Sequence, residues 1–143
     1  ESMVESMSLG RCIEFAVDAH RYQLDKLGKP YILHPLAVML QCEPVDQKVA
    51  VMHDIWEDVY EPKFIRVMVN LTEPEYVALE AITHLPNEPY VDYIKRVKTS
   101  EIATRVKIQD MIHNQSRMEG LPEDVVARMT KKYETAMKML LGD

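Results

Sequence analysis

The chain has 143 residues, 47% of them hydrophobic, and a formal net charge of −6. This length suits one domain with a single sizeable core and is too short for two ordinary domains. The acidic balance argues against binding of a DNA or RNA polymer through a broad basic surface. The 2 Cys residues lack the spacing of a metal site or a disulfide scaffold, and no apolar run is long enough to span a membrane. We therefore expect a cytoplasmic protein without a membrane anchor.

Apolar residues recur with helical spacing along the chain, and most of the prolines fall between these periodic stretches. The pattern predicts a compact, multi-helix, all-α fold that forms one domain over residues 1–143. We expect helices over 8–23, 35–40, 46–58, 72–85, 89–98, 100–118 and 122–141, and a short helix over 64–70. Capping residues, prolines and a glycine indicate the helix ends: Asp46, Thr72 with Glu75, Ser100, Pro35, Pro89, Pro122 and Gly142.

Two segments about fifty residues apart carry metal-ligand groups, and a histidine near the start of the chain adds another. His53 and Asp54 are neighbours in one predicted helix, Asp110 lies in a second, and His34 precedes a proline in a third. Two imidazoles and two carboxylates form a mixed nitrogen and oxygen set that suits Mn²⁺, with Fe²⁺, Zn²⁺ and Mg²⁺ as alternatives. Such a cation polarises a phosphoryl oxygen and makes water a better nucleophile. The sequence therefore predicts metal-assisted hydrolysis of a phosphate ester.

An acidic pair, Glu57 and Asp58, follows the first two ligands by one helical turn. These carboxylates are placed to orient or deprotonate the water, or to protonate the leaving group. Taken alone, a buried histidine can simply donate a hydrogen bond in the core, and an acidic pair at a helix end is commonly solvated. Asp110 lies in an apolar stretch, where unpaired carboxylates are rare, and this favours a site. The other histidines are expected to pack in the core or to line the pocket: His20, His84 and His113.

Four segments resemble the HD superfamily of metal-dependent phosphohydrolases, and more narrowly the hydrolase domain of RelA/SpoT proteins. They are residues 19–20, 28–35, 53–58 and 106–114, and their order and spacing cover about residues 8–120. The segments also look like those of the stand-alone small alarmone hydrolases of the metazoan SpoT-homologue type. The resemblance implies a helical HD-domain fold and a hydrolase without a synthetase domain.

The same resemblance implies a substrate, a cofactor and a set of site residues. The family removes the 3′-pyrophosphate of guanosine tetra- and pentaphosphate, (p)ppGpp, the alarmones of the stringent response, and releases pyrophosphate with GDP or GTP. It implies one Mn²⁺ per chain and a small-molecule nucleotide as the partner. A homo-oligomer is possible, but the sequence does not specify the oligomeric state. Catalysis is assigned to Glu57 and Asp58. The implied metal ligands are His34, His53, Asp54 and Asp110, and the implied substrate contacts are Lys26, Asn114 and Arg117.

The chain departs from the family pattern where the family contacts the base. A family arginine that packs against the base is Asp25 here, and a second family arginine is Ser116, followed by Arg117. A carboxylate in place of a stacking cation removes that contact and adds a like charge near an anionic ligand. Trp56 replaces a small aliphatic residue beside the acidic pair. Alternatives are therefore a phosphohydrolase of an adenosine alarmone, NADPH or a nucleoside monophosphate, and a non-catalytic nucleotide-binding module.

Overall fold

The computed structural model describes residues 3–55 and 69–142, with side chains from residue 8 onward. Within these ranges all regular elements are helices, apart from an isolated bridge between Leu24 and Pro30, which confirms the all-α prediction. The described helices are α1 (Met3–Ala19), α2 (Leu33–Leu40), α3 (Pro44–Met52), α6 (Glu73–Ile82), α7 (Tyr90–Lys98), α8 (Glu101–Ser116) and α9 (Glu123–Leu141).

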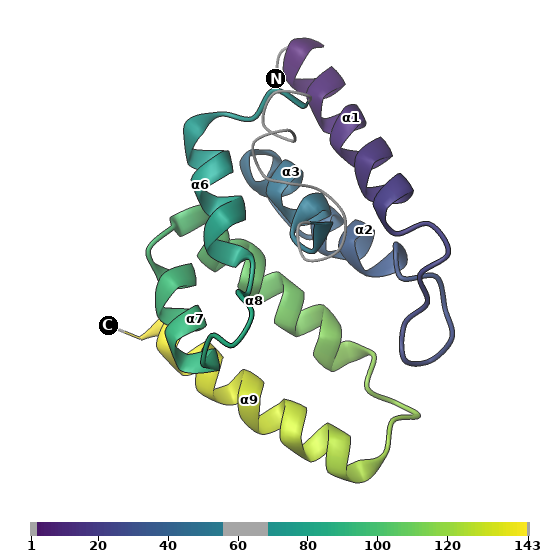
Figure 1. Cartoon of the computed structure of the whole chain (residues 1–143), viewed down its shortest axis with the longest axis vertical. Coiled ribbons are helices and arrows are strands. Elements are labelled where there is room, and N and C mark those ends of the chain that lie inside the picture. Colours follow the sequence, from purple (N-terminus) through teal and green to yellow (C-terminus); the bar gives the residue numbers. More distant parts are fainter. Residues whose placement is uncertain (1–2, 56–68, 143) are drawn as a thin grey trace.

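Two helices organise the packing of the others (Figure 1). Helix α3 contacts α1, α2, α6 and α8, so it lies in the middle of the bundle. Helix α8 contacts α2, α3, α6, α7 and α9, and α9 runs along α7 and α8 at one end of the molecule. The first turn of α2, the end of α3 and the middle of α8 thereby come together. These are the segments that carry the predicted metal ligands.

Buried apolar side chains from most of the helices form one hydrophobic cluster. Burial of each large side chain stabilises the fold by about 1.5–3 kcal/mol. On α8 the buried residues Ala103, Val106 and Asp110 follow at intervals of three and four, so Asp110 lies on the stripe that faces the core. The large side chains that are completely shielded from solvent are Val38, Val49, Val51, Met52, Ile55, Val69, Leu79, Ile94, Val97 and Met111.

Several predicted helix ends are confirmed. Thr72 and Glu75 form a capping box at the start of α6, in which the Glu75 amide donates to Thr72 Oγ1 at 3.3 Å and the Thr72 amide donates to Glu75 Oε1 at 2.8 Å. Ser100 caps α8 by accepting from the Ala103 amide at 3.1 Å. Pro122 is the N-cap of α9, and Gly142 follows its last residue.

The helix expected over 46–58 differs from the prediction at both ends. Its N-cap is Glu43, and Asp46 lies inside the first turn of α3, where it is buried. The Asp46 carboxylate accepts from Arg105 Nε at 2.7 Å and from a terminal guanidinium nitrogen of Arg105 at 2.9 Å. It therefore joins α3 to α8 instead of capping the helix. Helix α3 ends at Met52, so His53 and Asp54 lie in the turn that follows it.

Other boundaries are closer to expectation. The helix predicted over 8–23 is α1, which begins at Met3 and ends at Ala19, before a turn in which Tyr22 has a φ of 69°. The short helix predicted over 64–70 lies outside the described residues except for its last two positions. Within the described part of the chain, no helix combines the length and the hydrophobicity that a membrane span needs.

Candidate metal centre

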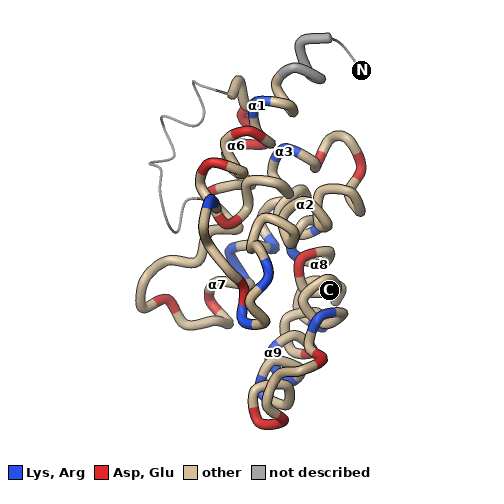
Figure 2. The backbone as a smooth tube through the Cα atoms, turned by 90° about the vertical axis from the view of Figure 1, so that its right-hand side faces the viewer, with Lys and Arg blue, Asp and Glu red and all other residues tan. Residues whose placement is uncertain are grey.

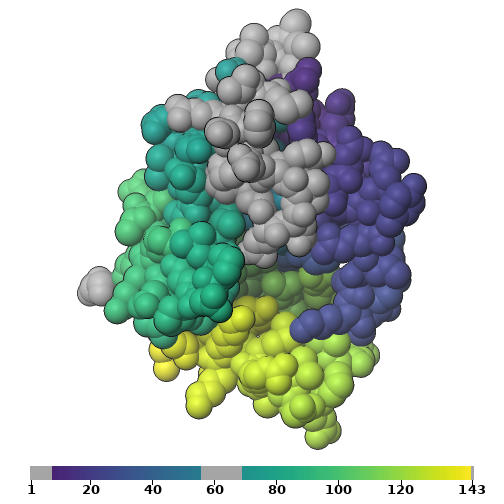
Figure 3. Space-filling view, in the orientation of Figure 1, coloured from purple at the N-terminus to yellow at the C-terminus, as the bar shows by residue number. Residues whose placement is uncertain are grey.

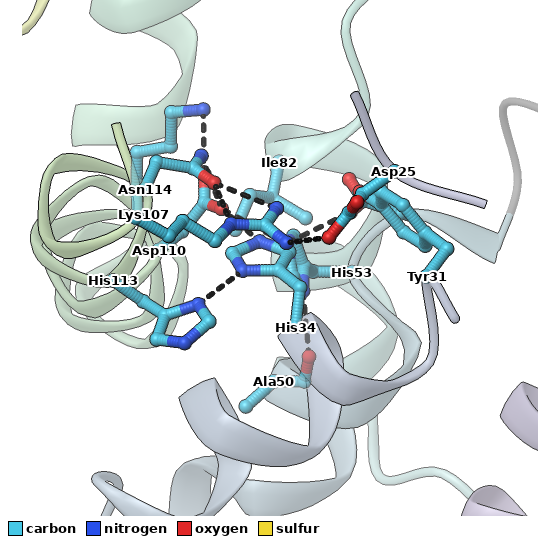
Figure 4. A network of polar contacts seen from close by, with 12 residues as sticks. Asp25, Tyr31, His34, Ala50, His53, Ile82, Lys107, Asp110, His113 and Asn114 are labelled. Atoms are coloured by element: carbon cyan, nitrogen blue, oxygen red, sulfur yellow. Dashed lines mark hydrogen bonds and ion pairs between the residues drawn. The ribbon is translucent and has the colours of Figure 1, made fainter. Parts of the chain in front are cut away.

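Three side chains from separate helical segments converge in the interior of the protein (Figure 4). His34 comes from the first turn of α2, His53 from the turn after α3, and Asp110 from the buried face of α8. One ligand atom of each lies within 4.8 Å of the others, and all three residues are buried. The distance from His34 Nε2 to Asp110 Oδ1 is 2.7 Å, and that from His53 Nε2 to the same oxygen is 3.2 Å. The arrangement could hold a metal ion.

The hydrogen bond of His53 to the backbone shows why a cation suits this position. Nδ1 of His53 donates to the carbonyl oxygen of Ala50 at 2.6 Å, so it carries a proton. In a neutral imidazole, Nε2 then has a lone pair, and this lone pair faces a carboxylate oxygen of Asp110. Two acceptors attract each other only through a cation between them, either a proton on Nε2 or a metal ion. The donor chemistry of the cluster therefore fits a divalent cation.

His34, like His53, makes a second contact through its other ring nitrogen. Its Nδ1 lies 2.7 Å from Nδ1 of His113, one turn further along α8 than Asp110, and the two rings are stacked. One proton shared between these nitrogens leaves Nε2 of His34 free to act as a ligand. His113 thus lies beside the cluster and contacts the candidate ligand His34, and it is not among the residues that line the cavity described below. His20 and His84 pack against Tyr31 and Tyr93, respectively.

Asp54 lies beside the three-residue cluster and contacts it through His53. Its Oδ2 is 3.2 Å from His53 Nε2, and the same oxygen accepts a hydrogen bond from the Tyr31 hydroxyl. Tyr31 belongs to the segment that precedes His34, so the hydroxyl joins this segment to the turn after α3. Tyr31 had no predicted role, because a single tyrosine forms no recognisable pattern in the sequence.

The charges of the cluster depend on one another. Burial alone would lower the pKa of His53, but Asp54 and Asp110 outweigh it and raise that pKa well above its ordinary value. Burial likewise tends to raise the pKa values of both carboxyls. The positive charges of His53 and Lys107 outweigh it for Asp110, whose pKa is well below its usual range, while His53 lowers the pKa of Asp54 to about 2. The cluster therefore has two carboxylates ready to receive a cation.

Lys107 is a buried partner of Asp110 that sequence analysis missed. Its Nζ lies 3.0 Å from Asp110 Oδ2, while the other oxygen of the same carboxylate faces the two histidines. Burial tends to lower the pKa of Lys107, but the charge of Asp110 outweighs it and raises that pKa well above its ordinary value. A spacing of three residues on one helix is the signal that could have identified this pair.

A cavity of about 290 Å³ adjoins the cluster, and all three residues predicted to contact the substrate line it: Lys26, Asn114 and Arg117. Tyr31 and Asn114 connect the cavity with the metal ligands, since Tyr31 donates to Asp54 and Asn114 Nδ2 lies 3.3 Å from Asp110 Oδ1. The far wall comes from α9 and the segment before it, through Leu121, Met129 and Tyr133. The cavity is therefore placed to hold a ligand whose reacting group reaches the cluster.

Asp25 lines the same cavity, at the position where the resemblance led us to expect an arginine. Its Oδ1 accepts from the amides of Leu27 and Lys29, both at 2.9 Å, which closes the loop around Gly28. Its Oδ2 lies 3.4 Å from a terminal guanidinium nitrogen of Arg117. The carboxylate shapes the loop and holds a cation at the cavity wall, neither of which an arginine side chain could do.

Arg117 also fixes Asn114. Nε and a second terminal nitrogen of Arg117 donate to Asn114 Oδ1 at 3.2 and 3.0 Å, which leaves the amide nitrogen of Asn114 for Asp110.

The predicted catalytic residues Glu57 and Asp58, together with Trp56, lie outside the described residues. A comparison with protein-family models finds no match to this chain.

Proposed function

We propose that this chain is a metal-dependent phosphohydrolase that removes the 3′-pyrophosphate of (p)ppGpp-like alarmones. The observation that carries the proposal is the convergence of His34, His53 and Asp110 next to a cavity whose lining residue Asn114 contacts Asp110. The resemblance of four segments to the RelA/SpoT hydrolase domain of the HD superfamily contributes the reaction and Mn²⁺ as the cofactor.

In this proposal His34, His53 and Asp110 hold the cation, and Asp54 is the fourth ligand because its carboxylate already contacts Nε2 of His53. When bound, the cation supplies Lewis-acid polarisation of a phosphoryl oxygen and lowers the pKa of water. His53 would give up the proton that it holds near the two carboxylates when a cation binds there. A set of two imidazoles and two carboxylates leaves room for the substrate and water at a cation that prefers six ligands.

Proton transfer is assigned to Glu57 and Asp58, which follow His53 and Asp54 in the sequence. One carboxylate takes the proton of the attacking water, and the other, as a carboxylic acid, protonates the leaving nucleoside oxygen. Adjacent carboxylates repel each other, so one of them keeps its proton to a higher pH than an isolated acid does. The pair thus provides a base and an acid in the same site.

The nucleotide occupies the cavity in this proposal. Lys26 contributes a positive charge for the phosphates, and Arg117 and Asn114 form the wall nearest the metal ligands. A volume of about 290 Å³ is close to the lower limit for small-molecule sites, so the ligand extends out of the opening.

A second candidate is the same chemistry on another phosphorylated nucleotide, such as an adenosine alarmone, NADPH or a nucleoside monophosphate. Asp25 favours this alternative, because its carboxylate lies in the cavity wall where the family has a base-stacking arginine. A carboxylate cannot stack on the base as an arginine does, so the contact that fixes the base in the family is missing and the base preference of the family does not carry over to this chain.

The test is a nucleotide panel with Mn²⁺-loaded protein, in which pyrophosphate and orthophosphate are measured separately. We expect pyrophosphate and GDP from ppGpp; orthophosphate or pyrophosphate from a different nucleotide instead supports the second candidate. Absence of turnover on every member of the panel, in protein that has bound Mn²⁺, contradicts the enzyme assignment.

A variant separates catalysis from metal binding. Glu57→Ala is expected to bind Mn²⁺ as the unaltered protein does and to lose at least about a hundredfold in kcat, the usual contribution of a general acid or base. Glu134→Ala, at an exposed position of α9, is the control that keeps its activity. Normal turnover by Glu57→Ala contradicts the role assigned to that residue.

A further inference from the structure

Two neighbouring tyrosines on α7 each lie under a lysine. The ring centroids of Tyr90 and Tyr93 are 5.8 Å apart. Lys107 Nζ lies 5.2 Å from the centroid of Tyr93, and Lys132 Nζ lies 4.3 Å from the centroid of Tyr90. Both distances fit an attraction between a cation and the ring face. The four side chains form a row in the order Lys107, Tyr93, Tyr90 and Lys132. Lys107, at one end of the row, also pairs with the candidate metal ligand Asp110.

Helix α9 brings Lys132 to this row. Helices α7 and α9 pack against each other, and Figure 3 shows them adjoining on one face of the molecule. Arg128 precedes Lys132 by four residues and therefore lies on the same side of α9. Met129 and Tyr133, each one position further along the helix, line the cavity beside Lys26. Lys132 and Arg128 are therefore adjacent on α9 to two residues that line the cavity.

The charges that act on Lys132 are mostly positive. Partial burial lowers the pKa of Lys132, and the charges of Lys107, Lys26 and Arg128 act in the same direction. The carboxylate of Asp110 tends to raise the pKa of Lys132, but this carboxylate is already paired with Lys107. In the described part of the chain, no carboxylate forms an ion pair with Lys132. Figure 2 shows other basic residues along α8 and α9, in a protein whose net charge is −6.

The Tyr90 hydroxyl is an unused hydrogen-bond donor in the same place. Its oxygen is shielded from solvent and has no hydrogen-bond partner among the described residues. Buried hydroxyl groups are nearly always hydrogen-bonded in native proteins. The Tyr90 ring is linked to Asp110 through the ring of Tyr93 and the ammonium of Lys107. An oxygen of a bound anion would complete the bonding of this hydroxyl.

We propose that Lys132 and Tyr90 form an anion subsite at the contact between α7 and α9, which binds a phosphoryl group of a polyphosphorylated ligand. The ammonium provides a compact charge, the phenol provides a donor, and Lys26 and Arg128 add to the positive field. The identification of the ligand as a nucleotide substrate rests on the proposed function. The subsite then holds a phosphate away from the bond that is broken, and it favours substrates with several phosphates over nucleoside monophosphates.

The experiment measures binding of inorganic pyrophosphate to metal-free protein by titration calorimetry in the presence of a chelator. We expect Lys132→Gln to weaken binding about tenfold, as for the loss of one charge-assisted hydrogen bond, and Tyr90→Phe to weaken it about threefold. Lys132→Arg should retain most of the affinity. Lys131→Gln, at the adjacent exposed position of α9, is the matched control that binds as the unaltered protein does.

Three results overturn the subsite: no binding of pyrophosphate to the unaltered protein, equal affinity in Lys132→Gln, or an equal loss in Lys131→Gln, which indicates general surface charge. Circular dichroism checks that each variant is folded, and Tyr90→Phe decides the question if Lys132→Gln is not. A nucleotide panel without turnover, together with pyrophosphate binding that depends on Lys132, contradicts the proposed function and leaves the subsite standing.

Discussion

Nε2 of His53 lies 3.2 Å from Oδ1 of Asp110, although the other ring nitrogen of His53 already donates to a backbone carbonyl. The pair therefore needs a positive charge between its two facing atoms. Without metal, a proton on the imidazole provides that charge, because the carboxylates of Asp54 and Asp110 outweigh burial and raise the pKa of His53 well above its ordinary value. A divalent cation would take the place of the proton, so metal uptake should release protons and stabilise the fold.

Replacement of Asp110 by asparagine should abolish stabilisation by Mn²⁺. In the unaltered protein, Mn²⁺ at a hundred times its Kd contributes about 2.7 kcal/mol, which raises Tm by about 5 to 10 °C in a chain of this size. Asp110→Asn keeps the shape of the side chain but loses the charge and should show almost no rise. Differential scanning calorimetry with and without Mn²⁺ measures the effect, with the exposed Asp124→Asn as the control. An equal rise in Asp110→Asn would show that the ion binds elsewhere.

The residues of the candidate site were predicted from the sequence more accurately than the backbone that carries them. His34, His53 and Asp110 were identified as metal-ligand residue types within segments that resemble the HD superfamily, and folding brings all three together. The local backbone of His53 was predicted incorrectly: α3 ends at Met52, so a helical face does not present His53 and Asp54 to the cation. Apolar periodicity continues past Met52 in the sequence, because a buried turn and a buried helix end require the same kind of side chain.

Partners contributed by distant segments could not be read from the sequence. The hydrogen bond from Tyr31 to Asp54 joins positions 23 residues apart, and no local pattern marks it. Likewise, Asp25 was interpreted only as the loss of a base contact, whereas its carboxylate closes a loop and binds Arg117. Loop geometry of this kind depends on backbone amides, which every residue carries, so the sequence shows only that a suitable acceptor is present.

Lys107→Met should destabilise the protein much more without metal than with it. The variant leaves the buried carboxylate of Asp110 without its ammonium partner, and breaking a buried pair in this way costs about 3–5 kcal/mol. Bound Mn²⁺ restores a positive charge at the same carboxylate, so a large part of the loss should be recovered. Urea denaturation in chelator and in excess Mn²⁺ gives the two free energies of unfolding.

The exposed Lys95→Met on the neighbouring helix α7 is the control for that comparison and should change neither free energy. If Lys107→Met loses the same amount in both conditions, Lys107 stabilises packing alone and has no electrostatic link with the metal ligands.

The ion pair between Glu88 and Arg96 should make the stability of the fold depend on pH under acidic conditions. Glu88 accepts from Nε and a terminal nitrogen of Arg96 at 2.9 and 2.8 Å, which lowers its pKa from 4.5 to about 2. Because the folded-state pKa is depressed, the stabilisation is complete above pH 4.5 and is lost as the pH falls toward 2. A bidentate pair near the surface contributes about 1 kcal/mol.

Glu88→Gln should therefore be less stable than the unaltered protein at pH 7, with a difference in unfolding free energy that shrinks steadily between pH 4.5 and pH 2. Denaturant titrations followed by circular dichroism at several pH values measure this difference. The exposed Glu134→Gln should show no such trend. A difference that stays constant down to pH 2 would mean that the two side chains are not paired in solution.

Arg117→Met should raise KM for the nucleotide that the panel identifies and leave the affinity for Mn²⁺ unchanged. Arg117 holds Asn114 Oδ1 with two hydrogen bonds, and this fixes the amide nitrogen toward Asp110. Without the guanidinium the amide can rotate, the cavity loses a positive charge, and Asp25 repels an anionic ligand more strongly. We expect KM to rise about tenfold, the effect of one lost charge-assisted contact.

Steady-state kinetics and Mn²⁺ titration measure the KM and the Mn²⁺ affinity of Arg117→Met, with the exposed Arg11→Met as the control. A loss of Mn²⁺ affinity equal to the rise in KM would show instead that Arg117 acts through the metal ligands, and that the cavity wall has no separate part in binding the nucleotide.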